Sequence, residues 1–249
     1  MNYFDHPEAA LRYAKYRPDY HELVMKQIRR FLQFKHKLPL GLDIACGTGL
    51  SSKALGLISE KVIACDGSSH MLHHAIANEH ISYFLKDENQ LEFDENSFDI
   101  ISIASGIHWM DTKKIFQTCE NLLKPKAWLL IYDHRILHEQ TFLKGWYEDY
   151  FLQEYPAPAR NKTEVQTELS EHLAFIKEEK FVHEISFQTE SFVQYLCTQS
   201  NVINAVLSGK KSYTEIENQL RNELLKISGD LESTFPVQFQ YNYQLIRKI

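Results

Sequence analysis

The first half of the chain alternates short apolar runs with stretches of mixed polarity. Five runs have the length and composition of buried strands: 38–45, 61–66, 81–86, 98–105 and 127–134. Three of the intervening stretches have the apolar spacing of helices: 49–58, 68–78 and 111–123. Short buried strands separated by helices predict a parallel sheet with helices on both faces.

The pattern changes after His134. Through 135–180 no strand is expected, and the helical segments there carry many aromatic residues, so this segment is interpreted as a helical cap. A strand is expected at 181–188, followed by helical stretches that include 212–227. In 236–248 apolar and polar residues alternate, which predicts a strand with one buried face, as in an antiparallel edge strand.

These elements assemble most simply into a Rossmann-like α/β fold. We expect a seven-stranded, mostly parallel sheet with helices on both faces, plus the helical cap. We divide the chain into an N-terminal half with lid helices at 1–134, the cap at 135–180, and the remaining strands and helices of the same domain at 181–249. The 249 residues are enough for one large domain with a sizeable core.

Composition and charge narrow the class of protein. Hydrophobic residues make up 44% and charged residues 24% of the chain, as in ordinary globular proteins. The net charge of −6 does not favour a nucleic-acid surface, so no nucleic-acid partner is expected. No long apolar run or signal-peptide pattern occurs, so we expect a cytoplasmic protein without a membrane partner. The 4 cysteines lack metal or redox spacing and are expected to be buried, reduced thiols.

Small residues cluster in the turn "DIACGTG" at 43–49, directly after the first predicted strand. A tight structural turn is one interpretation, and close approach of a ligand is the other. Asp66 at the tip of the next strand favours the ligand, because its carboxylate can accept both hydroxyl protons of a ribose. Ser52 stands where a dinucleotide pattern has its third small residue, and no phosphate-loop pattern occurs. The sequence therefore favours a nucleoside without a pyrophosphate.

With these features the chain resembles the class I S-adenosylmethionine-dependent methyltransferases. The motifs are "LDIACGTG", "CDGSSHMLHHA", "DENQLEFDENSFDIISIASGIHWMD" and "LLKPKAWLLI", in the family's order between about residues 40 and 134. "YAKYRPDY" and "YLCTQSNV" resemble, more weakly, the trans-aconitate methyltransferase-like group, which methylates small carboxylic acids. The chain departs from the family at Ala45, where glycine is usual, and at 125–127, where the family often has "PGG".

The resemblance implies a set of residues along S-adenosylmethionine. Its methionine part would meet Asp43, Ala45, Gly47, Gly49, Ala104 and Ser105. Its ribose would meet Asp66, and its adenine Gly67, Ser68, Met71, Asp87 and Glu88. Arg17 is the candidate cation for the cofactor's carboxylate, with a helix-surface salt bridge as the alternative.

The acceptor side is less defined. His108 is a candidate general base, although a packing or hydrogen-bonding role is the alternative, and Trp109 is either a pocket wall or a structural anchor. Trp146 and Tyr150 are candidate substrate contacts or cap core. Three cationic residues could each hold an acidic substrate, namely Arg135, Arg160 and Lys162. The alternative for each is a solvated surface charge. A metal site at the histidines of 70–74 is not expected, because no acidic ligand pattern accompanies them.

The expectation is therefore a methyltransferase acting on a small molecule, with O-methylation of an organic-acid carboxylate preferred. The alternatives are another metabolite, an acid carried as a malonyl thioester on a protein, and a cofactor-binding scaffold without turnover. Nothing in the sequence indicates the oligomeric state.

Overall fold

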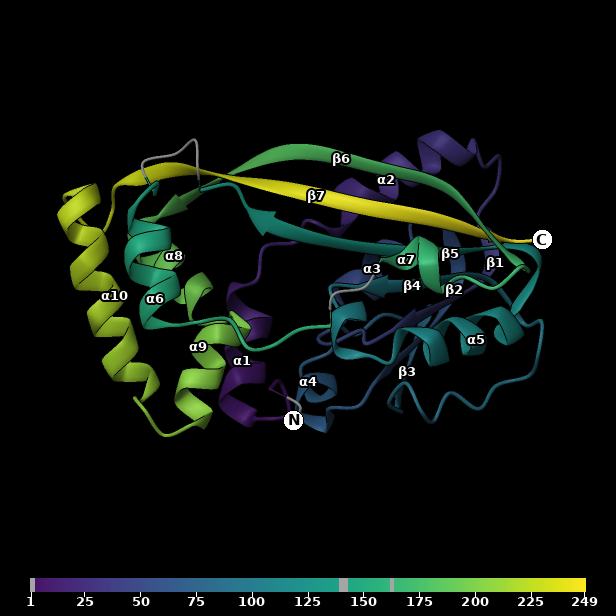
Figure 1. Cartoon of the computed structure of the whole chain (residues 1–249), viewed down its shortest axis with the longest axis horizontal. Coiled ribbons are helices and arrows are strands. Elements are labelled where there is room, and N and C mark those ends of the chain that lie inside the picture. The colour runs from purple at the N-terminus through teal and green to yellow at the C-terminus, as the bar shows by residue number, and fades with distance from the viewer. Residues whose placement is uncertain (1–2, 139–142, 162–163) are drawn as a thin grey trace. The chain divides into compact units, whose positions relative to one another are not determined.

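The computed structural model describes residues 3–138, 143–161 and 164–249. Its elements, in chain order, are α1 (Pro7–Tyr16), α2 (His21–Leu32), β1 (Leu38–Ile44), α3 (Leu50–Leu55), β2 (Ser59–Asp66), α4 (Ser69–His73), β3 (Ile81–Leu85), β4 (Phe98–Ala104), η1 (Ile107–Trp109), α5 (Thr112–Leu122), β5 (Leu123–Ile136), η2 (Trp146–Phe151), α6 (Leu152–Glu154), α7 (Val165–Glu168), β6 (Leu173–Gln188), α8 (Thr189–Leu196), α9 (Ser200–Leu207), α10 (Tyr213–Ser228) and β7 (Thr234–Lys248). Figure 1 shows them along the chain. The expected strands of the first half are all present.

The strands form one seven-stranded sheet in the order β3-β2-β1-β4-β5-β7-β6. The pairs among β1 to β5 are parallel, and β7 runs opposite to β5 (Figure 1). The expected Rossmann-like, mostly parallel sheet is therefore confirmed.

Two expectations about the last strands were wrong. β7 lies between β5 and β6 and is not an edge strand. Its alternating pattern indicates that one face of the strand is buried. An interior strand can have such a pattern as well as an edge strand. β6 begins at Leu173, inside the segment where no strand was expected. The first four residues of β6 are apolar, but four charged residues follow at 177–180, so the segment lacks the longer apolar run that marks the earlier strands.

The chain divides into two compact units. The first unit contains residues 3–18, 134–138, 143–159 and 181–240, and the second contains 19–133, 160–161, 164–180 and 241–249, as far as they are described. The residues that we expected as a cap are thus divided between the two units. Each unit is described by itself below.

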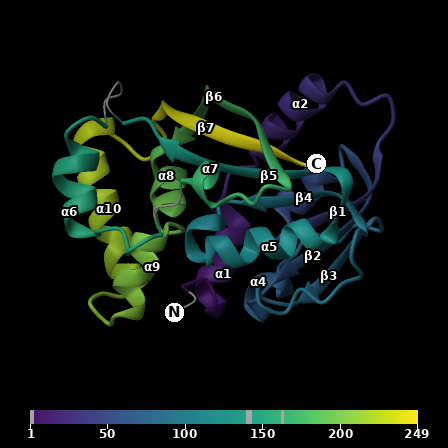
Figure 2. The same cartoon turned by 45° about the vertical axis from the view of Figure 1, so that its right-hand side comes forward.

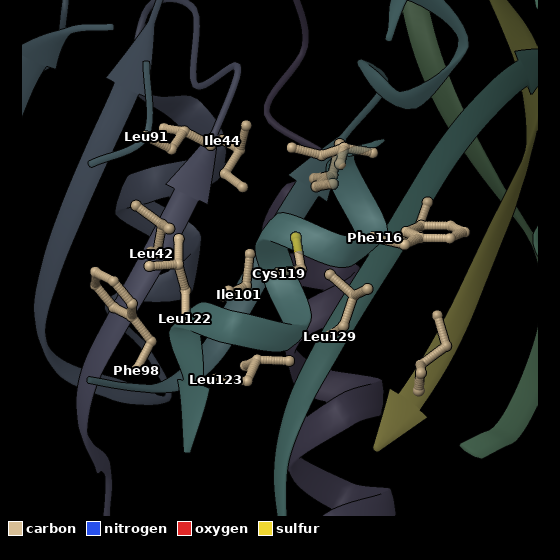
Figure 3. Packing of buried hydrophobic residues seen from close by; sticks show 14 of the residues in the cluster. Leu42, Ile44, Leu91, Phe98, Ile101, Phe116, Cys119, Leu122, Leu123 and Leu129 are labelled. Carbon is tan, nitrogen blue, oxygen red and sulfur yellow. The ribbon is translucent and has the colours of Figure 1, made fainter. Parts of the chain in front are cut away.

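The core of the second unit lies between the sheet and α5. Figure 3 shows Phe116 and Cys119 of α5 packed among strand residues that include Ile101 and Leu129, and all four are 0–2% exposed. α5 begins at its N-cap Asp111, whose carboxylate accepts the N–H of Lys114. Figure 2 shows α5 beside the strands β1 to β4 from a second direction. This packing fixes the strand ends from which the candidate site is built.

The first unit is mainly helical. Its helices α8 and α10 pack together, and α10 begins with a reciprocal capping box between Ser212 and Glu215. Arg12 of α1 is paired with Glu8 and Glu217 and donates to Gln194 at 3.2 Å. These contacts join α1 to the helices that follow β6.

Candidate active site

The turn after β1 has an unusual backbone. Ala45, Gly47 and Gly49 have φ angles of 58°, 55° and 82°, so every second residue is in the left-handed region. A Cβ atom at Gly49 would overlap the Tyr83 hydroxyl, and one at Gly47 would lie 3.1 Å from the Met71 methyl carbon. The backbone angle therefore favours glycine at 47 and 49, and the Tyr83 hydroxyl also leaves little space for a side chain at 49.

Asp43 is fully buried at the end of β1. Its Oδ2 accepts hydrogen bonds from the hydroxyls of Ser51 at 2.6 Å and Ser52 at 2.7 Å, which begin α3. Its Oδ1 has no hydrogen-bond partner among the described residues. Burial raises the pKa of this carboxyl to about 6, and the two serine hydroxyls oppose the shift. The side chain thus ties the turn to α3 and keeps one buried acceptor oxygen.

Asp66 joins two loops at the end of β2. Its Oδ2 accepts the N–H of Gly47 and its Oδ1 accepts the N–H of Ser68, both at 2.8 Å. The Ser68 hydroxyl accepts the N–H of Met71 and so caps α4. A Cβ at Gly67 would lie 3.1 Å from the Cβ of Asp87, which brings the loop after β3 to the same place.

The remaining adenine-side candidates lie in this loop. Asp87 and Glu88 are half-buried, and Asp87 accepts the N–H of Asn89 at 2.8 Å.

α4 ends earlier than expected because the N–H of Ile76 bonds to the carbonyl of Thr48 at 3.1 Å and not to its own helix. The structure therefore brings together the expected residues at the carboxyl ends of β1, β2 and β3.

A second group lies at the carboxyl ends of β4 and β5. Ala104 is 9% exposed, and Ser105 follows it with a φ of 52°. The Ser105 hydroxyl donates to Asp133 Oδ1 at 2.6 Å and lies 2.9 Å from the hydroxyl of Tyr20. His108 Nδ1 lies 3.6 Å from Asp133 Oδ2. Asp133 therefore faces Ser105 with one oxygen and His108 with the other.

His108 is surrounded by polar and aromatic groups. Its ring lies 4.7 Å from that of Trp109, and the Arg160 guanidinium lies 5.5 Å from the Trp109 ring centre. Asn161 donates its N–H to the His108 carbonyl at 3.0 Å. Burial lowers the pKa of His108, the Asp133 charge raises it, and the Arg160 charge lowers it. The net effect favours a neutral imidazole.

The other expected residues belong to the first unit. Arg17 donates to the Thr198 carbonyl at 3.0 Å and lies over the rings of Tyr13 and Tyr195. Trp146 and Tyr150 are neighbours in the π-helical segment η2, with ring centres 5.7 Å apart. Arg17, Trp146 and Tyr150 therefore stay candidates for contacts with the cofactor or the substrate.

Two of the three candidate cations are described by the structure. Arg135 donates to Gln240 at 3.1 Å, also in the first unit, and Arg160 lies beside Trp109 in the second. Lys162 lies outside the described residues.

Three further residues of this region were not expected from the sequence: Tyr20, Tyr83 and Asp133. Asp133 had a detectable signal, since it is an acidic residue at the tip of a predicted strand, as Asp66 is. Tyr20 and Tyr83 reach Ser105 and Gly49 from distant parts of the chain, and no local pattern reports such contacts.

Two further features are absent from the described residues, 3–138, 143–161 and 164–249. No group of three or more His, Cys, Asp or Glu side chains in those ranges could hold a metal ion. Within the same ranges, no helix has the length and apolar character needed to cross a membrane.

The fold is that of the Rossmann-like methyltransferases. A structure from Anaeromyxobacter dehalogenans described as a type II methyltransferase is 19% identical, with a TM-score of 0.70 over 92% of this chain and 97% of that one. Phosphoethanolamine N-methyltransferase 2 of Haemonchus contortus, bound to phosphomonomethylethanolamine and S-adenosylhomocysteine, is 18% identical, with a TM-score of 0.56 over 99% of this chain and 59% of that one. At such identities the likeness shows the fold alone.

Sequence similarity to known proteins covers the segment that runs from β1 into β5. Residues 42–131 match the family model of the methyltransferase domain. A Dictyostelium discoideum protein named as a methyltransferase is 22% identical over 153 residues, 57% of this chain. The match also spans 57% of that relative's length. The matched segment is therefore similar to the methyltransferase domain, and it spans less than half of this chain.

Proposed function

We propose that this protein is an S-adenosylmethionine-dependent methyltransferase that acts on a small molecule. The observation that carries the proposal is the joined turn after β1 and β2, in which Asp66 holds Gly47 within a methyltransferase domain. The small residues at 45, 47 and 49 let a ligand approach the backbone, and the strand ends are where parallel sheets bind ligands.

One observation of the structure indicates that the residues present fit this cofactor: a buried oxygen of Asp43 that lacks a donor among the described residues. Asp43 Oδ1 is a buried acceptor without a donor among the described residues, and an ammonium group would satisfy it. Asp66 would hold the ribose hydroxyls with the same carboxylate that accepts the N–H groups of Gly47 and Ser68. Met71 and Gly67 would flank the adenine, and Asp87 and Glu88 would meet its amine. Ala104 and Ser105 would face the methionine end, with Arg17 as candidate partner of its carboxylate.

The cofactor would supply an electrophilic methyl group on a sulfonium. The chain's own residues would bind and orient the acceptor and exclude water from it. For the acceptor we propose an organic acid that is methylated on a carboxylate oxygen. Support comes from Arg160, which lies over Trp109 and whose positive charge is close enough to lower the pKa of His108. A carboxylate is already anionic at neutral pH, so such an acceptor needs positioning and no base.

A second candidate is an acceptor hydroxyl or amine. The His108–Asp133 pair favours it, because a neutral imidazole beside a carboxylate can take up a proton as the methyl group is transferred. The four buried cysteines are free thiols, in keeping with our proposal that the protein acts in the cytoplasm.

Two measurements test the proposed function. S-adenosylhomocysteine should raise the free energy of unfolding by roughly 2.7 kcal/mol at a hundredfold excess over its Kd. No thermal shift at millimolar concentration would count against the cofactor. A screen for transfer of a labelled methyl group to carboxylic acids, phenols and amines then separates the acceptor classes, and transfer to none of them would favour a binding scaffold.

A further inference from the structure

A directed hydrogen-bond chain ends at Asp133. Carboxylate oxygens only accept, so the Ser105 hydroxyl donates its proton to Asp133 Oδ1, at 2.6 Å. That hydroxyl has no second proton, so the contact of 2.9 Å with Tyr20 is a donation from Tyr20 to Ser105. Tyr20 is 4% exposed, and Ser105 is further held by its N–H bond to the Tyr132 carbonyl. This hydrogen-bond chain holds one oxygen of the Asp133 carboxylate, whose side chain is 43% exposed.

The same carboxylate faces one nitrogen of His108. Asp133 Oδ2 lies 3.6 Å from Nδ1, which is longer than a hydrogen bond, and its charge raises the pKa of His108 against the effect of burial. The imidazole cannot turn freely, since its side chain is 13% exposed and its ring packs on Trp109. No described residue makes a hydrogen bond to Nε2. A negative charge beside Nδ1 favours the neutral tautomer that carries its proton there.

We infer that Asp133 is a positioning residue that holds His108 as its Nδ1–H tautomer, so that Nε2 accepts a hydrogen bond from a hydroxyl or amino group of the acceptor. Combined with Arg160, this selects organic acids that also carry a hydrogen-bond donor, such as hydroxy acids. The substrate part of the inference rests on the proposed function, whereas the tautomer part does not.

The tautomer is measured directly. ¹⁵N NMR of the imidazole nitrogens, with His108 assigned through His108→Gln, should show Nδ1 protonated in the wild-type protein at pH 8. In Asp133→Asn the amide can donate to Nδ1, so the proton should move to Nε2. Asp111→Asn is the matched control, because it removes a neighbouring exposed carboxylate, keeps a good N-cap, and should leave the tautomer unchanged. An Nε2-protonated His108 in the wild-type protein overturns the inference.

The substrate class is tested with two acids that differ by one hydroxyl. With S-adenosylhomocysteine bound, L-malate should bind about tenfold more tightly than succinate in calorimetry, because a hydrogen bond is gained. In Asp133→Asn the ratio should fall to about one, and in Asp111→Asn it should persist. Ser105→Ala, which releases Asp133, should lower the ratio if Asp133→Asn does not fold.

The outcomes separate the two levels of proposal. Equal affinities for malate and succinate in the wild-type protein, or an unchanged ratio after the tautomer has switched, overturn the proposed selection. Failure to bind S-adenosylhomocysteine overturns the proposed function instead, and the NMR result still decides the role of Asp133.

Discussion

The Asp66 carboxylate accepts the backbone N–H of Gly47 at 2.8 Å, so the tip of β2 holds the turn that follows β1. The same side chain holds the next loop through the N–H of Ser68. The residue expected to bind the ribose is therefore also a structural clamp between two loops. Its replacement should affect both the ligand and the turn.

Asp66→Ala should weaken binding of S-adenosylhomocysteine by about 1.5–3 kcal/mol, because hydrogen bonds to a charged group are lost. Isothermal titration measures the loss. Asp94→Ala, which removes an exposed carboxylate elsewhere in the same unit, should bind normally. An unchanged affinity in Asp66→Ala would show that the ribose lies elsewhere.

Gly49→Ala should destabilise the fold by about 2–4 kcal/mol, because the new methyl group meets the Tyr83 hydroxyl and the residue keeps a left-handed φ of 82°. The reverse change is the matched control. Ala45→Gly removes a side chain from a φ of 58° and should leave the stability within about 1 kcal/mol of the wild type, or raise it. Urea unfolding measures both variants, and equal losses in the two would contradict the argument.

The buried carboxyl of Asp43 should make stability depend on pH. Its pKa is about 6 in the folded protein, against a reference value of 3.8, so the folded state binds this proton more tightly. The contribution is therefore fully favourable below about pH 4 and is lost as the pH rises to about 6, by on the order of 3 kcal/mol. The unfolding free energy of wild type minus that of Asp43→Asn should fall across this range. Parallel curves for the two proteins would rule out the shift.

His108→Ala should keep methyl transfer to a carboxylate within about tenfold of wild type, because no proton is removed from such an acceptor. Activity should also not fall as the pH drops through the histidine range near 6.5. Steady-state rates between pH 5.5 and 8 check both points, with cofactor binding as the control. A thousandfold loss with a rising limb near pH 6 would instead support a hydroxyl or amine acceptor.

Much of the sheet and part of the site follow from local sequence. The first five strands are short apolar runs, and Asp66 stands close enough in sequence to the small-residue turn for the two to be linked. The start of β6 was missed because four charged residues at 177–180 interrupt its short apolar run. The position of β7 was missed because alternation of apolar and polar residues indicates which face of a strand is buried, but not which strands lie beside it.

The acceptor side depends on contacts between distant residues. Tyr20 reaches Ser105 and Ser105 reaches Asp133 across long stretches of chain, and each is an ordinary residue in its local sequence. Only packing of the strand ends brings them together.

The position of β7 also orders events during synthesis. In the finished sheet β7 separates β5 from β6, yet the ribosome makes β6 first and adds three helices before β7. A nascent chain that has reached β6 therefore has two long strands whose common neighbour does not yet exist. If β5 paired directly with β6, no position would remain between them for β7. Correct folding therefore requires that the facing edges of β5 and β6 stay unpaired until β7 has been synthesised.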